Sequence, residues 1–151
     1  MRAEFQVLII PFIKDENGSI KYAVFRRKDN KNWQFIAGGG EDTEKPPDAA
    51  KRETKEEANI TSDDFFILKT KTMIPITEFD AHRNKKGLYV IPEYCFGVKI
   101  NSLSIDISNE HTEFKIVEYD DAVSLLQYDG NKTALWELNE RIKEGDLKRA
   151  Y

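Results

Sequence analysis

The sequence predicts a mixed α/β fold in which helices cover a sheet. Segments rich in β-branched and aromatic residues, separated by turn signals, occur in both halves of the chain, and one strongly helix-forming segment lies between them. Two further helical segments follow the last predicted strand. Strands, an internal helix, more strands and terminal helices are an order typical of helices packed on a sheet.

The first two strands form a predicted hairpin. Residues Phe5–Ile13 are mostly β-branched or large and apolar, which indicates a strand buried on both faces, with Pro11 near an edge or a bend. The pair Asn17-Gly18 is a strong hairpin signal. We therefore expect Lys21–Arg27 to return beside the first strand.

The middle of the chain predicts a strand, a glycine loop and a helix. Trp33–Ile36 reads as a short strand that ends in the loop Gly38-Gly39-Gly40. Strong helix formers occupy Asp48–Ala58, with Pro46 and Pro47 at the entry, where a missing N–H is tolerated. Asn59 is suited to the helix end because it tolerates the left-handed conformation.

The remaining elements follow from the same patterns. The predicted strands are Phe65–Ile76, Glu93–Ile100 and Glu113–Val117, and the predicted helices are Asp120–Gln127 and Thr133–Lys143. A polar loop, Thr77–Leu88, joins the first two of these strands and carries the one basic cluster, which includes His82. We expect this loop either to close over a polyphosphate or simply to be solvated.

The composition limits the possible functions. The 151 residues fit one domain, 1–151, and an aromatic content of 11% argues against disorder. A net charge of −4 argues against an extended nucleic acid or a membrane surface as partner, because both attract basic faces. One cysteine, Cys95, cannot form an intrachain disulfide, and no apolar run approaches the roughly 18 residues of a membrane span, so we expect a cytoplasmic protein.

A cluster of acids on the central helix carries the chemistry. Glu53, Glu56 and Glu57 are spaced i, i+3 and i+4, so they project from one helix face, although like charges at this spacing destabilise a helix. A cation would explain the cluster, and oxygen ligands favour a hard ion such as Mg²⁺ together with substrate phosphate oxygens. Glu44 precedes the helix and can fold over the same face, and Arg52 can pair with Glu56.

The glycines before this helix allow a ligand to approach the backbone closely. A strand, glycine loop and helix beside a metal cluster would suit a diphosphate. The loop Gly38–Gly40 has no following Gly-Lys-Ser/Thr and no GxGxxG spacing, which disfavours a P-loop kinase or a dinucleotide-binding dehydrogenase.

The complete spacing resembles the Nudix box, the signature of the Nudix hydrolases. The match consists of Gly38, Glu44, Arg52-Glu53 and Glu56-Glu57. Two positions depart from the pattern: Thr54 replaces an aliphatic residue and Asn59 replaces a glycine. Thr54 is expected on the inward helix face with Ala50, where it weakens packing rather than chemistry. The resemblance implies the family's α/β/α sandwich.

The resemblance also implies roles. It places the metal, Mg²⁺ or Mn²⁺ as a substitute, on Glu53, Glu56 and Glu57, with Glu56 and Glu57 as main ligands and Glu53 either sharing a metal or orienting the attacking water. Glu110 would be a further ligand or the general base, or else a surface residue beside a structural His111. Glu44 and Arg52 complete the expected catalytic group.

The sequence constrains the substrate-binding residues less than the metal-binding residues. The candidate substrate-binding residues are Gly38, Gly39, Gly40, Arg27, Trp33 and Phe35. Either Arg26 or Arg27 is expected to point toward the site and bind phosphate, and we favour Arg27. Trp33 and Phe35 would stack a base, although strand aromatics usually belong to a core.

The implied activity is hydrolysis, by water attack at phosphorus, of a nucleoside triphosphate or related nucleoside-diphosphate-X compound to a monophosphate and pyrophosphate. Segments around 33–35, 109–111 and 131–135 resemble enzymes acting on dATP or dihydroneopterin triphosphate. The alternative is a non-catalytic, nucleotide-sensing module of the same fold. The expected partner is a small nucleoside polyphosphate, and the family implies a monomer or a homodimer.

Overall fold

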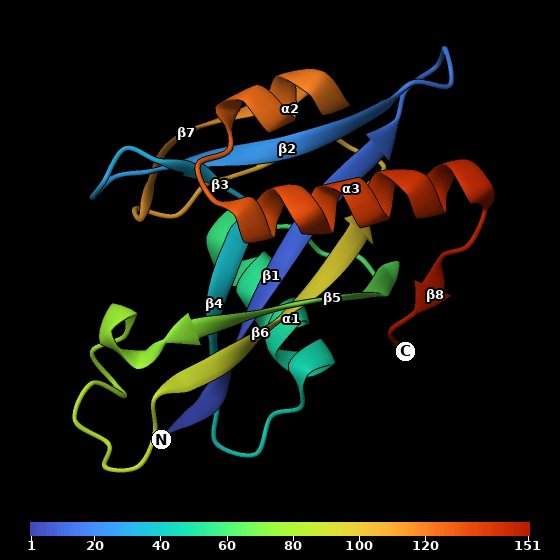
Figure 1. Cartoon of the computed structure of the whole chain (residues 1–151). Helices are drawn as coiled ribbons and strands as arrows, with labels where there is room; N and C mark the ends of the chain where they lie inside the picture. The colour runs from blue at the N-terminus through green and yellow to red at the C-terminus, as the bar shows by residue number, and fades with distance from the viewer.

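The computed structural model describes residues 1–151 and contains one eight-stranded sheet with helices on both of its faces (Figure 1). In chain order the elements are β1 (Arg2–Lys14), β2 (Ile20–Arg27), β3 (Trp33–Gln34), β4 (Ile36–Glu41), α1 (Pro46–Ala58), β5 (Phe65–Pro75), a 3₁₀ turn (Ile76–Glu78), β6 (Val90–Lys99), β7 (His111–Val117), α2 (Tyr119–Leu125), α3 (Asp129–Glu144) and β8 (Lys148–Arg149). The predicted mixed α/β class is confirmed, whereas the strand β4, the 3₁₀ turn and the strand β8 were not predicted.

β1 lies at the centre of the sheet. One of its edges pairs in parallel with β6 from Gln6 to Phe12. The other edge pairs with β4 as far as Ile9 and with β2 from Phe12 onward. Pro11 therefore occupies a central strand, not an edge, and it lies where this second edge changes partner. A residue without an N–H is tolerated there because neither β4 nor β2 pairs with Pro11 on this edge, although β6 pairs with it on the other.

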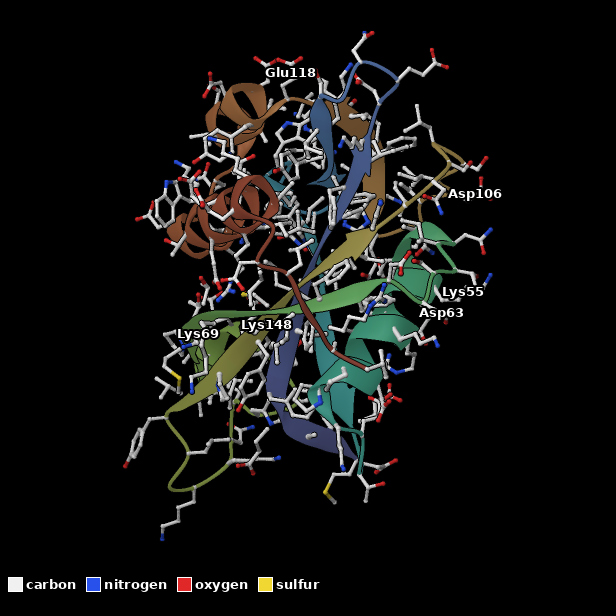
Figure 2. The ribbon with its side chains drawn as sticks, turned by 90° about the vertical axis from the view of Figure 1, so that its right-hand side faces the viewer. Lys55, Asp63, Lys69, Asp106, Glu118 and Lys148 are labelled. Atoms are coloured by element: carbon white, nitrogen blue, oxygen red, sulfur yellow. The ribbon has the colours of Figure 1, made fainter.

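The helices form a layer on each face of the sheet. α1 covers one face, while α2 and α3 cover the other, as both views show (Figures 1 and 2; Lys55 marks α1 in Figure 2). Alternate residues of β1 divide between two hydrophobic clusters: Val7 and Ile9 pack toward α1, and Leu8 and Ile10 pack toward α3. Each cluster contains 14 buried residues, so both faces contribute to the core.

α1 begins and ends as its sequence predicts. Pro46 occupies the first helical position, and Asn59 caps the C-terminus with a left-handed φ of 54°. Thr54 is fully buried on the inward face, and its hydroxyl donates a hydrogen bond of 2.7 Å to the carbonyl oxygen of Ala50. The polar atom is thus satisfied, which explains why a threonine is tolerated where the family pattern has an aliphatic residue.

A bulge in β5 shapes the α3 face. The register between β5 and β6 shifts between Ile67 and Lys71. The Glu137 carboxylate of α3 accepts the backbone N–H groups of Lys69 and Thr70 at 2.7 and 2.8 Å. This side chain replaces the strand partner that the bulged residues lack and holds α3 against β5.

Candidate active site

The three glycines lie in a strand and not in a loop. Gly38, Gly39 and Gly40 belong to β4, where Gly38 pairs with Val7 and Gly39 with Gln6 of β1. The predicted phosphate-cradling loop is therefore wrong. The turn that connects β4 to α1 comes later, and the Glu44 carboxylate accepts a hydrogen bond of 2.9 Å from the N–H of Glu41 there.

The glycines make room for neighbouring side chains. A Cβ added at Gly38 would lie 2.1 Å from Cδ of Glu53, and one at Gly39 would lie 2.6 Å from Nη1 of Arg2. A Cβ at Gly40 would meet the Phe5 ring at 2.2 Å. Gly38 and Gly39 line the cavity described below, whereas Gly40 does not, so the substrate-binding role expected of Gly40 is not supported.

The α1 acids differ in exposure. The side chains of Glu53 and Glu57 are only 8% and 9% exposed, whereas that of Glu56 is 54% exposed. All three line one cavity, together with Glu110 from the loop before β7. The three carboxylates of α1 therefore line one wall of the cavity, with Glu53 and Glu57 buried and Glu56 exposed to solvent.

Arg52 organises one half of this cluster. Its guanidinium binds both oxygens of Glu44 at 2.8 and 2.9 Å and reaches Glu53 at 2.9 Å and Glu56 at 3.2 Å. It also donates to the carbonyl oxygen of Gly39 at 2.9 Å. Hydrogen bonding to Glu44 raises the pKa of Arg52 and lowers that of Glu44. Arg52 is thus a positioning residue that joins the turn, the helix and β4.

Glu57 lies outside the reach of Arg52. Its Oε2 accepts a hydrogen bond of 2.7 Å from the Ser108 hydroxyl and lies 3.5 Å from Nδ1 of His111. Burial, reinforced by the neighbouring Glu110 and Glu53, raises the pKa of Glu57 to about 7 although the Ser108 bond opposes the shift. Ser108 was not recognised in the sequence, where a loop serine carries no distinguishing pattern.

His111 does not close the loop through its side chain. Both ring nitrogens are buried without a hydrogen-bond partner, and burial followed by the charge of Arg27 lowers the pKa of this imidazole. The ring packs on Phe25, with centroids 5.5 Å apart, and the loop contact is made instead by the backbone N–H, which donates to the carbonyl oxygen of Ser108. A neutral His111 therefore supplies no positive charge to Glu57.

The acids have the chemistry of divalent-cation ligands, although their side chains do not converge into a complete coordination site. No group of three or more His, Cys, Asp or Glu side chains converges in the arrangement of a metal centre. The donors are nevertheless all carboxylate oxygens, as a hard cation requires. Burial also raises the pKa of Glu53, although Arg52 opposes the shift. Since Glu57 has no cationic partner, an ion shared by Glu53, Glu56, Glu57 and Glu110 would relieve their repulsion.

A cavity of about 900 Å³ extends from these acids across the edge of β4 to the N-terminus of α3. Arg27 lines it and forms two hydrogen bonds of 2.9 Å to the carboxylate of Asp29. Arg26 instead donates to the carbonyl oxygen of Lys31. The structure therefore places Arg27, rather than Arg26, beside the candidate site.

The two aromatic candidates do not line the cavity. Phe35 is fully buried in the core on the α3 face, so it cannot stack a base, and that expectation is wrong. Trp33 is half-buried, and its ring lies 5.1 Å from Nζ of Lys115. The polar residues Gln6, Gln34, Glu93 and Asn131 line the cavity instead. Interruptions of apolar strands by Gln6 and Glu93 were a signal that sequence analysis overlooked.

The basic loop is anchored and not free. His82 is completely buried beside Phe79, and Lys85 lies 3.6 Å from the Glu4 carboxylate of β1. Arg83 pairs with Asp80 at 3.3 Å. The loop is therefore packed on the N-terminal part of β1, and two of its cations, Arg83 and Lys85, are engaged with protein carboxylates, whereas Lys86 is exposed.

Comparison with known proteins agrees with the fold and shows the family. The model of the NUDIX domain family matches residues 6–138. A Listeria monocytogenes protein assigned to the NUDIX hydrolases has 44% identity, covers 97% of this chain and 99% of its own, and superposes with a TM-score of 0.87. No curated protein matches the chain. No helix is long and apolar enough to cross a membrane.

More distant structures share the fold. The Escherichia coli dihydroneopterin triphosphate pyrophosphohydrolase has 23% identity, a TM-score of 0.75 and coverage of 91% of this chain and 97% of its own. An Ap4A hydrolase from Caenorhabditis elegans has 21% identity, a TM-score of 0.70 and coverage of 94% and 99%.

The sandwich fold and the acidic helix beside β4 define a hydrolase of phosphorus-containing acid anhydrides, a class that generally uses divalent metal ions. The chain belongs to the NUDIX family.

Proposed function

We propose that the protein is a Mg²⁺-dependent pyrophosphohydrolase, with Mn²⁺ as a possible substitute. Its substrate would be a nucleoside triphosphate or related nucleoside-diphosphate-X compound, such as dATP or dihydroneopterin triphosphate, and the products would be a monophosphate and pyrophosphate. The observation that carries the proposal is the pair of buried carboxylates, Glu53 and Glu57, on the wall of a cavity large enough for a nucleotide. A single sheet also supports residues 1–151 as one domain, and the lone Cys95 supports a cytoplasmic location.

The proposed roles follow from position. When bound, a divalent ion neutralises phosphate oxygens and lowers the pKa of a coordinated water. Glu56 and Glu57 would be the main ligands of the ion, Glu53 and Glu110 would be further ligands, and Arg52 would keep Glu53 oriented toward the ion. Glu53 or Glu110 would take the proton of the attacking water. Arg27 lines the same cavity as the acids and would bind a phosphate after exchanging its contact with Asp29.

The test is pyrophosphate release from a panel of nucleoside and pterin triphosphates with Mg²⁺. We expect Glu57→Gln to lower kcat/KM at least about a hundredfold, because the amide cannot supply the charge of the carboxylate. Glu16→Gln, in the exposed β1–β2 turn, is a matched control with wild-type turnover. If no compound is turned over, or Glu57→Gln is as active as wild type, the proposed function is wrong.

A further inference from the structure

Four buried polar side chains line the cavity, each at most 8% exposed: Gln6 of β1, Gln34 of β3, Glu93 of β6 and Asn131 of α3. Gln34 pairs with Phe25 of the cluster packed under α1, whereas the other three lie on the α3 side of the sheet, remote from α1. Leu8 and Cys95, two residues beyond Gln6 and Glu93 on their strands, belong to the cluster packed under α3. The cavity therefore joins the acids on one face to a polar floor on the other.

Three of these four side chains have no hydrogen-bond partner within the protein, and the fourth, Asn131, has one. The Glu93 carboxyl forms no hydrogen bond or ion pair, and burial alone raises its pKa to about 7. The side-chain amides of Gln6 and Gln34 are likewise unpaired, although both residues are 8% exposed. Asn131 uses its Oδ1 to accept the N–H of Phe35 at 3.0 Å, which leaves its NH₂ group free.

The polar atoms of these side chains are accessible from the cavity and are not sealed in the core, where only the rings of His82 and His111 have buried nitrogens without a partner. Largely buried side chains that present unpaired polar groups to one cavity nevertheless call for an explanation. Burying a carboxyl group without a donor lowers stability unless something supplies the donor. The groups open onto a cavity that already contains the candidate catalytic acids. A ligand that supplies the missing hydrogen bonds is the simplest explanation, since binding pockets combine apolar walls with a few convergent polar groups.

The arrangement of acceptors and donors restricts the ligand. Glu93 lies directly opposite Gln6 in the parallel pairing of β6 with β1, and adjacent strands are about 4.8 Å apart. A carboxylate offers two acceptors side by side, and the neighbouring amide offers a donor. A ligand ring that complements Glu93 and Gln6 presents, along one edge, two adjacent N–H donors followed by a carbonyl oxygen. Adenine and cytosine present only one donor beside a ring acceptor on the corresponding edge.

We propose that this polar floor binds the ring of the substrate and that Glu93 determines specificity for a 2-amino-4-oxopyrimidine ring, the unit shared by guanine and pterins. The exocyclic NH₂ and the ring N–H would donate to Glu93, and the Gln6 amide would donate to the carbonyl oxygen. The inference rests on the proposed function and names its substrate class. The triphosphate would then extend past Gly39 toward the acids of α1.

The first experiment measures binding of GMP, 7,8-dihydroneopterin and AMP in the presence of Mg²⁺ by calorimetry. GMP or dihydroneopterin is expected to bind wild type at least about tenfold more tightly than AMP. In Glu93→Gln one acceptor becomes an NH₂ group that faces the ring donors, so this preference should be lost. Glu113→Gln, an exposed glutamate of β7 outside the cavity, should keep it.

The same variants separate a binding role from a structural one. Glu93→Gln removes a buried carboxyl without partners, so its melting temperature should equal or exceed that of wild type. A loss of preference with a preserved melting temperature supports the proposal. Should Glu93→Gln fail to fold, Glu93→Asp serves as the second variant, because it keeps the carboxylate and is expected to retain a weakened preference for GMP or dihydroneopterin. Equal affinities of wild type for GMP and AMP would overturn the proposal.

Measurements of turnover distinguish guanine from a pterin as the preferred ring. They also separate the proposed hydrolase function from the proposed role of Glu93 in specificity. Comparing kcat/KM for GTP, dihydroneopterin triphosphate and ATP shows whether guanine or a pterin is preferred. Preferred binding of GMP or dihydroneopterin without turnover of any triphosphate would contradict the proposed function and support the specificity of the floor. Turnover with ATP preferred, or with the preference intact in Glu93→Gln, would support the hydrolase and refute the role of Glu93.

Discussion

At the scale of single residues, Gly38 and Glu53 depend on each other. The Glu53 carboxyl occupies the space that a side chain at Gly38 would fill. Arg52 then holds Glu53 from the other side with a hydrogen bond of 2.9 Å. The first glycine of the motif is thus required by the packing of an acid against a strand and not by backbone flexibility.

This packing predicts the effect of Gly38→Ala. The added Cβ would displace the Glu53 carboxyl, and we expect kcat/KM for the best substrate to fall at least about tenfold while the strand still forms. Gly18→Ala in the β1–β2 turn, where φ is +84°, is the control for the same change in residue type. It should cost about 1 kcal/mol of stability and leave turnover of folded protein unchanged. Wild-type kinetics in Gly38→Ala would contradict the proposed importance of Glu53 placement.

At the scale of elements, α3 is fastened to the bulge of β5 by one carboxylate. Glu137 accepts the N–H groups of Lys69 and Thr70 and the Nε–H of Arg141 at 2.8 Å. Burial alone would raise the pKa of Glu137, but these donors outweigh burial and hold it below its ordinary value. The ionised form is therefore the one that the folded protein favours.

Glu137→Gln should lower the free energy of unfolding by about 1–3 kcal/mol at pH 7, because one oxygen that accepts two hydrogen bonds is replaced by a donor. Since the folded-state pKa is depressed, the wild-type contribution is present above the unfolded pKa and is lost as pH falls through the folded value. The difference between wild type and variant should therefore shrink in acid. Urea denaturation at pH 7 and near pH 3 measures it, and an equal difference at both values would contradict the assignment.

At the scale of the whole molecule, the cavity connects two faces of the sheet. α1 supplies carboxylates on one face, and β1, β6 and α3 supply the polar floor on the other. The route between them passes β4, whose Gly38 and Gly39 carry no side chain to obstruct it. Both layers must therefore be assembled before substrate and metal can bind together.

A ligand that bridges the two layers should stabilise the whole fold. The α,β-methylene analogue of GTP with Mg²⁺, at about one hundred times its Kd, should add about 2.7 kcal/mol, which corresponds to roughly 5–10 °C in melting temperature for a domain of this size. Differential scanning calorimetry measures the shift. The control is the same scan of Glu57→Gln, in which the shift should largely disappear. A plain structural domain with an acidic helix would show no shift in either protein.

Much of the fold could be predicted from local pattern. The apolar run of β1, the Asn17-Gly18 turn and the caps of α1 are properties of short segments, and the structure confirms them. β8 was missed because two exposed residues, Lys148 and Arg149, carry no periodicity and pair only because β5 offers a free edge. Pro11 lies in a central strand and not at an edge of the sheet because Val98 of β6, far along the chain, pairs beside it.

The sequence by itself determined the family and the acidic helix, because the spacing of Glu53, Glu56 and Glu57 along one helix needs no knowledge of distant contacts. Only the tertiary structure decided that Gly38–Gly40 form a strand, that Phe35 belongs to the core and that Arg27 rather than Arg26 faces the cavity. It also brought Gln6 and Glu93 together across 87 residues of chain, through parallel pairing of β1 with β6. Such pairing depends on which strands become neighbours, and local residue pattern does not specify that choice.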